Sequence, residues 1–357
     1  MTDYDFILQD RIAKIQAINE QYDLEHNAYI SFSGGKDSTI LHYLIDMALP
    51  NNKIPRLFLN TGIEYKLIRN HVKRMAELDK RIVIYNSNIN IKKMLTDYGY
   101  PFKSKQHAHN WSIYNNNNIE LDNIIKYLTE NPNERFNYEY IHNLPKGIKT
   151  IVKYVFGIRE KDTPLSVVER ERESIIDNAM AIMTSPECLR YQFTKDFKDN
   201  GIKLSDKCCY KLKKENALKY ENESNRHIAI TGIRGEEGGM RGLNGCTIFE
   251  DDKLKKFHPL KVVSEQWEED FIRENNIKLC DLYYPPYNFK RTGCKGCPFA
   301  LDLQNQLDIM RELLPNEYKQ CEILWKPVYD EYRRIGYRLS NKIEKQMTIW
   351  DVMNDDK

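Results

Sequence analysis

Short apolar runs of strand length alternate with longer segments in helical spacing over the first 85 residues. The helical pattern covers residues 7–22, residues 40–47 and a charged segment that ends near Leu78. The runs expected to be strands are residues 28–32, 57–59 and 82–85. This β-loop-α alternation predicts a parallel sheet with right-handed crossovers.

The alternation stops over residues 86–225, which are rich in Asn, Tyr and Lys. Helical spacing at residues 119–129 and 165–183 predicts a mainly helical insertion, with a loop at residues 115–118 and Cys208-Cys209 near its end. The sheet resumes at residues 228–231. Two more helices are expected at residues 265–275 and 303–314, with an aromatic, Cys-bearing loop at residues 283–299 between them.

The fold class expected from this order is α/β, a doubly wound parallel sheet interrupted by a helical insertion and followed by a Cys-bearing helical region. We expect residues 1–85 and 226–300 to build the α/β domain, residues 86–225 the insertion, and residues 301–357 the C-terminal helices and tail.

Composition narrows the class of protein. The 357 residues are 41% hydrophobic and 30% charged, and 54 basic against 52 acidic residues leave a net charge of +2, so a strongly basic nucleic-acid-binding surface is not indicated. No apolar run reaches the roughly 18 residues of a membrane helix, and the first residues lack a signal core, so we expect a cytoplasmic protein. Eight cysteines then favour metal or redox chemistry over disulfides.

A glycine loop lies between the first strand and its helix. It consists of Ser33, Gly34, Gly35, Lys36, Asp37, Ser38 and Thr39. Two glycines allow close backbone approach, the helix N-terminus directs N–H groups at an anion, and lysine and hydroxyl groups add further donors. The loop is not a Walker A motif, which would require glycine where Ile30 stands.

These residues resemble the signature of the PP-loop ATP pyrophosphatases and, within that superfamily, the phosphoadenosine phosphosulfate reductase family. Further resemblance is carried by residues 59–65, by residues 232–237 with Arg241 behind them, and by Pro259-Leu260, Trp267, Asp270, residues 275–277, Leu282-Tyr283 and Gly293-Cys294. The resemblance covers residues 28–299, with the insertion poorly matched. It implies a HUP-like fold that binds ATP with Mg²⁺ and breaks the bond between the α- and β-phosphates.

The resemblance also implies site residues. The catalytic candidates are Lys36, Asp37, Arg234 and Arg241, and the nucleotide-binding candidates are Ser33, Gly34, Gly35, Lys36, Asp37, Ser38, Thr39, Asn60, Thr61, Gly62 and Gly232. The segment from Lys103 to His107 resembles a family segment near the substrate. His107 and His109 are expected to be structural or surface histidines.

Two cysteine pairs form a candidate metal centre, namely Cys208-Cys209, followed by Lys211 and Lys213, and Cys294 with Cys297 in a Cys-x-x-Cys turn. Four thiolates suit zinc or an iron–sulfur cluster, although adjacent cysteines are unusual for structural zinc. The pattern resembles the 4Fe-4S site of adenylyl-sulfate reductases and implies that cluster, with zinc and simple thiols as alternatives. Four protein ligands would leave no iron open to substrate, so an electrostatic or structural role is expected.

The other four cysteines have separate interpretations. Cys280 lies in an apolar pattern typical of packing, and Cys321 lies in a charged helix. Cys246 follows Arg241 closely and Cys188 lies in the insertion. Whether Cys188 or Cys246 carries sulfur stays open.

Two departures from the reductases favour adenylation. Residues 338–357 contain no cysteine or Glu-Cys-Gly-Leu-His motif, and the glycine loop is intact. We therefore expect ATP-dependent adenylation of an acceptor, DNA or tRNA, followed by sulfur transfer from a donor such as a cysteine desulfurase. The alternatives are an adenylyl-sulfate or phosphoadenylyl-sulfate reductase and a non-catalytic adenylate sensor. Residues 346–350 resemble a sliding-clamp peptide, with capping of a terminal helix as the simpler interpretation.

Overall fold

The computed structural model describes residues 2–131, 134, 137–156, 202–237 and 245–340. The helix expected at residues 165–183, Cys188, Arg241 and the clamp-like residues 346–350 lie outside the described residues. The chain forms two compact units. The first comprises residues 1–89 and 210–295, and the second comprises residues 90–209 and 296–357.

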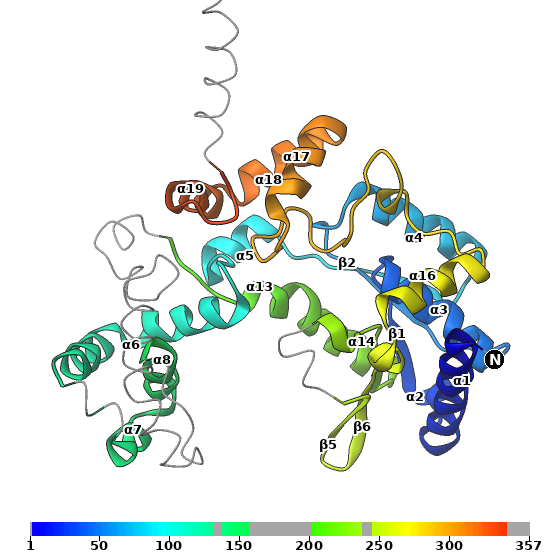
Figure 1. Cartoon of the computed structure of the whole chain (residues 1–357), viewed down its shortest axis with the longest axis horizontal. Helices are drawn as coiled ribbons and strands as arrows, with labels where there is room; N and C mark the ends of the chain where they lie inside the picture. The colour runs from blue at the N-terminus through cyan, green and yellow to red at the C-terminus, as the bar shows by residue number, and fades with distance from the viewer. Residues whose placement is uncertain (1, 132–133, 135–136, 157–201, 238–244, 341–357) are drawn as a thin grey trace, which may run out of the picture. The chain divides into compact units, whose positions relative to one another are not determined.

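The first unit is built on a six-stranded sheet in the order β3-β2-β1-β4-β6-β5 (Figure 1). Its strands are β1 (Ala28–Ser31), β2 (Arg56–Asn60), β3 (Ile82–Asn86), β4 (Ile228–Ile230), β5 (Thr247–Glu250) and β6 (Lys253–Phe257). The four predicted strands are confirmed as β1 to β4, and all pairs except β5–β6 are parallel. The fold is therefore α/β and consistent with a HUP-like arrangement.

The antiparallel β5–β6 hairpin is absent from the pattern-based prediction. Asp251 and Asp252 form its turn with φ of 49° and 59°. Positive φ at both central residues fits a two-residue hairpin turn, a geometry that Asp adopts more readily than most residues. The Lys-rich sequence of β6 hides this strand, because only Leu254 and Phe257 among its five residues are buried.

Helices cover both faces of this sheet. They are α1 (Asp3–Tyr22), α2 (Leu24–Asn27), α3 (Lys36–Ala48), α4 (Lys66–Leu78), α14 (Glu215–Ser224) and α16 (Glu265–Glu274). On one face, Ile30 and Ile230 pack in a core with residues of α1, α3 and α16. On the other face, Tyr29 and Ala229 pack with Tyr220 of α14. Alternate strand residues therefore face opposite helical layers, as a doubly wound sheet requires.

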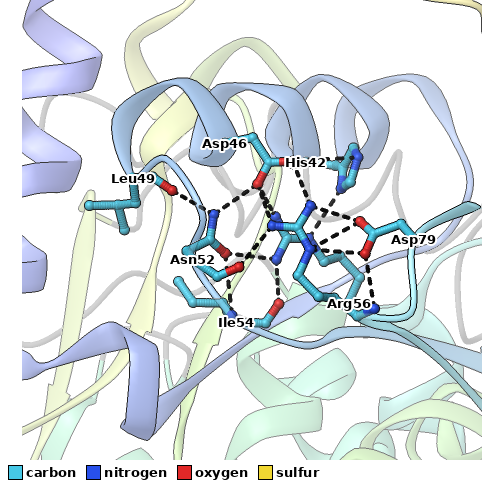
Figure 2. Close-up of polar contacts among 8 residues, drawn as sticks. His42, Asp46, Leu49, Asn52, Ile54, Arg56 and Asp79 are labelled. Atoms are coloured by element: carbon cyan, nitrogen blue, oxygen red, sulfur yellow. Dashed lines mark hydrogen bonds and ion pairs between the residues drawn. The ribbon is translucent and has the colours of Figure 1, made fainter.

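An ion-pair network lies at the amino end of β2 (Figure 2). Arg56 is fully buried and donates to His42 Nδ1 at 3.1 Å and to Asp46 Oδ1 at 2.6 Å. Arg81 bonds both Asp46 and Asp79. Although His42, Asp46 and Asp79 cluster closely enough to hold a cation, two guanidinium groups already neutralise the acids. We interpret the cluster as a brace between α3 and the β2 and β3 strands.

The second unit is helical in the part that the structure describes. Its helices are α5 (Ile91–Tyr98), α6 (Lys105–Glu130), α7 (Tyr138–Asn143), α8 (Lys146–Phe156), α13 (Lys207–Cys209), α17 (Leu303–Leu313), α18 (Pro315–Leu324) and α19 (Lys326–Ile335). Among the described residues, no helix combines the length and apolar character needed to cross a bilayer.

The loop expected at residues 115–118 is wrong, because α6 continues through it. Asparagine has modest helix propensity, so the run of Asn residues favours a break when it is considered alone. Buried Trp111, Leu121, Ile125 and Leu128 lie on either side of this run in α6. Tertiary burial of an apolar helix face thus outweighs local propensity here.

Candidate nucleotide site and cysteine turn

The glycine loop connects β1 to the first turn of α3. Gly34 has a φ of 71°, and a Cβ there would lie 2.6 Å from Val72 Cγ2, so only glycine fits. Ser38 Oγ accepts from Ser33 N at 3.2 Å and donates to Gly35 O at 3.0 Å. The hydroxyl groups therefore hold the loop in a tight turn at the amino end of α3, where backbone dipoles favour an anion.

Tyr283 closes one side of the loop from a short 3-10 segment, Asp281–Tyr283. Its hydroxyl accepts a hydrogen bond from Lys36 N at 2.9 Å and pairs with Thr292 Oγ1 at 2.7 Å. Burial raises the pKa of Tyr283 to about 12, so the hydroxyl stays neutral. Sequence reasoning matched Tyr283 to a family pattern without assigning it a role, and it missed Thr292.

Gly232 closes the loop from the end of β4. A Cβ at this position would lie 2.9 Å from Asp37 O and 3.0 Å from Asp37 C, which are backbone atoms that cannot rotate away. Only glycine therefore allows β4 to approach the first turn of α3 this closely. The predicted residues Gly232, Asp37 and the glycine loop are thus brought together in the first unit.

Lys36 and Arg234 both contact one buried carboxylate, that of Glu268 in α16. Glu268 Oε2 is 3.3 Å from Lys36 Nζ and 3.3 Å from Arg234 Nε, and the Glu268 side chain has 0% exposure. Burial, reinforced by Asp37, raises the pKa of Glu268 to about 7, while the two cations oppose this rise. Sequence reasoning missed Glu268, since a glutamate next to Trp267 in a charged helix has no distinguishing local signal.

Two exposed acids lie outside this group. Glu236 accepts a hydrogen bond from Arg234 at 3.1 Å and another from Glu265 N at 3.2 Å. Glu265 Oε1 is 3.4 Å from Lys36 Nζ, and Lys36 lowers the pKa of Glu265. A polyphosphate that binds Lys36 and Arg234 would replace solvated carboxylates at little cost, because exposed ion pairs contribute little free energy.

The Asn60-Thr61-Gly62 turn follows β2 and is organised by Glu64. The Glu64 carboxylate accepts from Thr61 N and Gly62 N, both at 3.0 Å, and from Thr61 Oγ1 at 2.7 Å. Gly62 has a φ of 84°. These donors therefore shape the turn, and nucleotide binding by Asn60, Thr61 and Gly62 stays a prediction.

His258 is a buried group that sequence reasoning missed. It follows β6, and its Nδ1 lies 2.6 Å from Thr231 Oγ1 at the end of β4. Burial, with Lys256 and Lys261 nearby, lowers the pKa of His258 to about 4. A neutral imidazole thus joins the carboxyl ends of two neighbouring strands, close in sequence to Gly232. The His-Pro pair before residue 260 is the only local signal that could have indicated it.

The Cys-x-x-Cys turn has two halves that are held differently. In the first unit, Lys295 N donates to Ile63 O at 2.9 Å, just after the Thr61-Gly62 turn. In the second unit, Gly296 has a φ of 59°, and a Cβ there would lie 2.7 Å from Cys321 Sγ. Tyr329 donates to Gly296 O. Glycine is therefore required between the two cysteines, as expected for a tight Cys-x-x-Cys turn.

Within the second unit, residues 100–103 are hydrogen-bonded near the segments that precede Cys208-Cys209 and follow Cys297. Tyr100 and Leu204 form a parallel bridge, which places residues 203–205 beside residues 99–100 shortly before Cys208-Cys209. Lys103 N donates to Tyr332 OH at 2.6 Å, and Tyr332 OH donates to Pro298 O at 3.0 Å, one residue after Cys297. Residues 100–103 are therefore hydrogen-bonded to residues 203–205 and to Tyr332, and Tyr332 in turn contacts the residue after Cys297.

The four cysteines offer the thiolate donors that zinc and iron–sulfur clusters take, Cys294 from the first unit and the other three from the second. Cys208 is buried and Cys209, Cys294 and Cys297 are partly buried, as suits ligands shielded from solvent. A π-helical turn, Tyr210–Lys214, directly follows Cys208-Cys209, and such turns are frequent at functional sites. The identity of the metal stays a prediction.

The remaining candidates lie as follows. Lys103 is buried, with its Nζ 4.8 Å from the Tyr337 ring centroid, and His107 is buried near Phe102. His109 is exposed and pairs with Asp206, so both histidines have the structural or surface settings expected. Cys280 is buried, whereas Cys246 is partly buried and its carbonyl accepts a hydrogen bond from His258 N. Lys211 pairs with Glu215.

The chain was compared with known proteins. The model of the phosphoadenosine phosphosulfate reductase domain matches residues 27–132 and 159–300, which is more than half of the chain. No curated protein matches the chain. A solved structure of phosphoadenylyl-sulfate reductase from Candida auris in a phosphate complex shares 12% identity at a TM-score of 0.38, covering 82% of this chain and 96% of that chain.

Proposed function

The chain belongs to the phosphoadenosine phosphosulfate reductase domain family, and on that premise we propose that it cleaves ATP between the α- and β-phosphates to adenylate an acceptor. The family is enzymatic and uses nucleotides in sulfur chemistry, and this chain shares that general function. The observation that carries the proposal is that Lys36 and Arg234 contact the same carboxylate, Glu268, beside a glycine loop at a helix N-terminus.

The residues of the loop supply the charge stabilisation that this reaction needs. Lys36 and the N–H groups at the start of α3 would bind the departing pyrophosphate, and Arg234 would neutralise charge from the β4 side. Asp37 lies in the first turn of α3, where its carboxylate would hold Mg²⁺. Bound Mg²⁺ would neutralise phosphate oxygens and orient the phosphates for in-line displacement.

We propose sulfur transfer to nucleic acid as the purpose of adenylation. An adenylated oxygen of DNA or tRNA is a good leaving group, which a sulfur nucleophile from a cysteine desulfurase or a similar donor would displace. Cys208, Cys209, Cys294 and Cys297 would hold a 4Fe-4S cluster, or zinc as the second choice. Their local turn and partial burial support ligation, and the cluster would supply electrostatic or structural support.

The second candidate function is reduction of adenylyl-sulfate or phosphoadenylyl-sulfate. Family membership favours it, because that chemistry gives the family its description. In that reaction the phosphate-binding loop would hold a nucleotide that is already cleaved, and Lys36 would bind its phosphate without a pyrophosphate leaving group.

Product analysis separates these candidates. Anaerobically purified chain would be incubated with Mg-ATP and either tRNA or DNA, and in parallel with adenylyl-sulfate and thioredoxin. Adenylation predicts AMP or adenylated acceptor with pyrophosphate, lost in Lys36→Met and kept in Lys53→Met, which changes an exposed lysine of the α3–β2 connection. Sulfite release without ATP consumption would instead establish the reductase, and tight ATP binding without any product would indicate a sensor.

A further inference from the structure

In the candidate phosphate site, one buried carboxylate contacts two cationic side chains. Glu268 Oε2 lies 3.3 Å from both Lys36 Nζ and Arg234 Nε. The Lys36 and Arg234 side chains are 15% and 5% exposed, so the group is shielded from solvent. When Glu268 is ionised, the side chains of Lys36, Arg234 and Glu268 together carry one positive charge.

The contacts of Glu268 are ion pairs without well-aligned hydrogen bonds. Within the part of the chain that the structure describes, neither Glu268 oxygen nor Arg234 Nε has a hydrogen-bond partner of good geometry. A buried carboxylate without aligned donors is costly, and it would gain by closing on one partner. Both cations contact the same oxygen, Oε2, at the same distance, so they compete for it.

Removing one cation should therefore change the position of the other. If Lys36 is lost, Arg234 can close the 3.3 Å gap into a direct hydrogen bond with Glu268, and it is then withdrawn from any incoming anion. Loss of Arg234 would let Lys36 do the same. Each cation thus depends on the other to remain available.

We propose that Glu268 is a positioning residue that couples Lys36 and Arg234 into one binding unit for the pyrophosphate part of a nucleotide. This inference rests on the proposed function, because it assumes that these two cations bind phosphate. The shared carboxylate holds both cations toward the same anion and limits their combined charge. The substrate class is a nucleoside triphosphate, with inorganic pyrophosphate as the product that this unit must release.

A double-mutant cycle on the full chain tests the coupling. Calorimetry would measure binding of inorganic pyrophosphate and of ATP to wild type, Lys36→Met, Arg234→Met and the double variant, each with Glu268 and with Glu268→Gln. Glu269→Gln is the matched control, because Glu269 is the exposed neighbour in the same helix. Thermal unfolding would verify that each variant is folded.

With Glu268 present, each single variant should weaken pyrophosphate binding by about 30-fold, and the double variant by less than about 100-fold, well below the product of the two effects. With Glu268→Gln the two effects should multiply, and that variant alone should bind pyrophosphate about 3- to 10-fold more tightly, since a nearby negative charge is gone. If Glu268 had only a structural role, Glu268→Gln would instead weaken pyrophosphate binding.

The outcomes separate two kinds of failure. Wild type that binds pyrophosphate while the single effects multiply with Glu268 present would overturn the coupling and leave the proposed function intact. Wild type that binds neither pyrophosphate nor ATP would contradict the proposed function and the coupling together. If Glu268→Gln does not fold, the cycle with Glu268 present still shows whether the effects of Lys36→Met and Arg234→Met multiply, because it requires no change at position 268.

Discussion

Tyr283 accepts a hydrogen bond from Lys36 N although 247 residues separate them. At the residue scale, the glycine loop and its lysine could be identified from sequence because their types are demanded locally by a tight turn and an anion. Tyr283, Thr292 and Glu268 reach the loop only through the fold. No local spacing distinguishes them from ordinary aromatic and charged residues, so sequence reasoning could not assign their roles.

Tyr283→Phe should weaken ATP binding by about 5- to 30-fold, because it removes the acceptor of Lys36 N at a cost of about 1–2 kcal/mol. Calorimetric titration with Mg-ATP would measure the change. Tyr284→Phe is the matched control, since its hydroxyl accepts from Leu279 N at 3.1 Å away from the loop. Equal ATP affinity in both variants would mean that the Tyr283 hydroxyl does not organise the loop.

At the scale of elements, strands β1 to β4 and helices α1, α3, α4, α16 and α17 follow from apolar periodicity, with their ends shifted by a few residues. The pattern fails where burial elsewhere decides the outcome. Helix α6 crosses a polar Asn run because its flanking residues are buried, and β6 pairs with β4 and β5 inside the sheet despite three lysines in its five residues. Both cases depend on tertiary contacts that one sequence does not display.

The brace at the amino end of β2 contains two arginines that contact the same acid, Asp46. We expect their substitution to lower the free energy of unfolding by different amounts. Arg56→Met should reduce the free energy of unfolding by about 3 kcal/mol, because it leaves Asp46 and His42 without a fully buried partner. Arg81→Met should cost about 1 kcal/mol, since the Arg81 side chain is 27% exposed and water can replace it. Urea unfolding would measure both, and equal costs would contradict this ranking.

His258 predicts how stability depends on pH. Its pKa of about 4 in the folded chain lies below the ordinary value of about 6.5, so between these values the unfolded chain binds more protons. Stability should therefore fall as the pH drops from about 6.5 to 4, by up to about 3 kcal/mol for this group. Urea unfolding of wild type and His258→Gln across this range should show a shallower loss in the variant, and parallel curves would exclude His258 as a source.

At the scale of the whole molecule, the α/β fold and the family were predictable because the glycine loop and the motifs at residues 59–65 and 232–237 resemble one family. The acceptor could not be predicted from the sequence, because the insertion carries no recognisable motif. The division between the two units falls inside the Cys-x-x-Cys turn, between Lys295 and Gly296, whereas we expected the α/β domain to continue to residue 300. No apolar pattern marks this position.

The cysteine assignment predicts about four iron and four sulfide per chain after anaerobic purification. Cys208→Ser and Cys297→Ser should lose most of this content, because both thiolates would be ligands. Cys280→Ser should retain it, since Cys280 is a buried packing residue whose pKa is raised by burial. Metal and sulfide analysis would check this. Analysis that finds one zinc per chain and no sulfide would show that the cysteines hold zinc and not a cluster.

The most direct test of ATP cleavage uses ATP labelled at its γ-phosphate, with Mg²⁺ and nucleic-acid acceptors, and follows where the label goes. We expect labelled pyrophosphate from wild type and none from Lys36→Met. Labelled orthophosphate with ADP, or ATP left unchanged with every acceptor while adenylyl-sulfate is reduced, would contradict cleavage at the bond between the α- and β-phosphates.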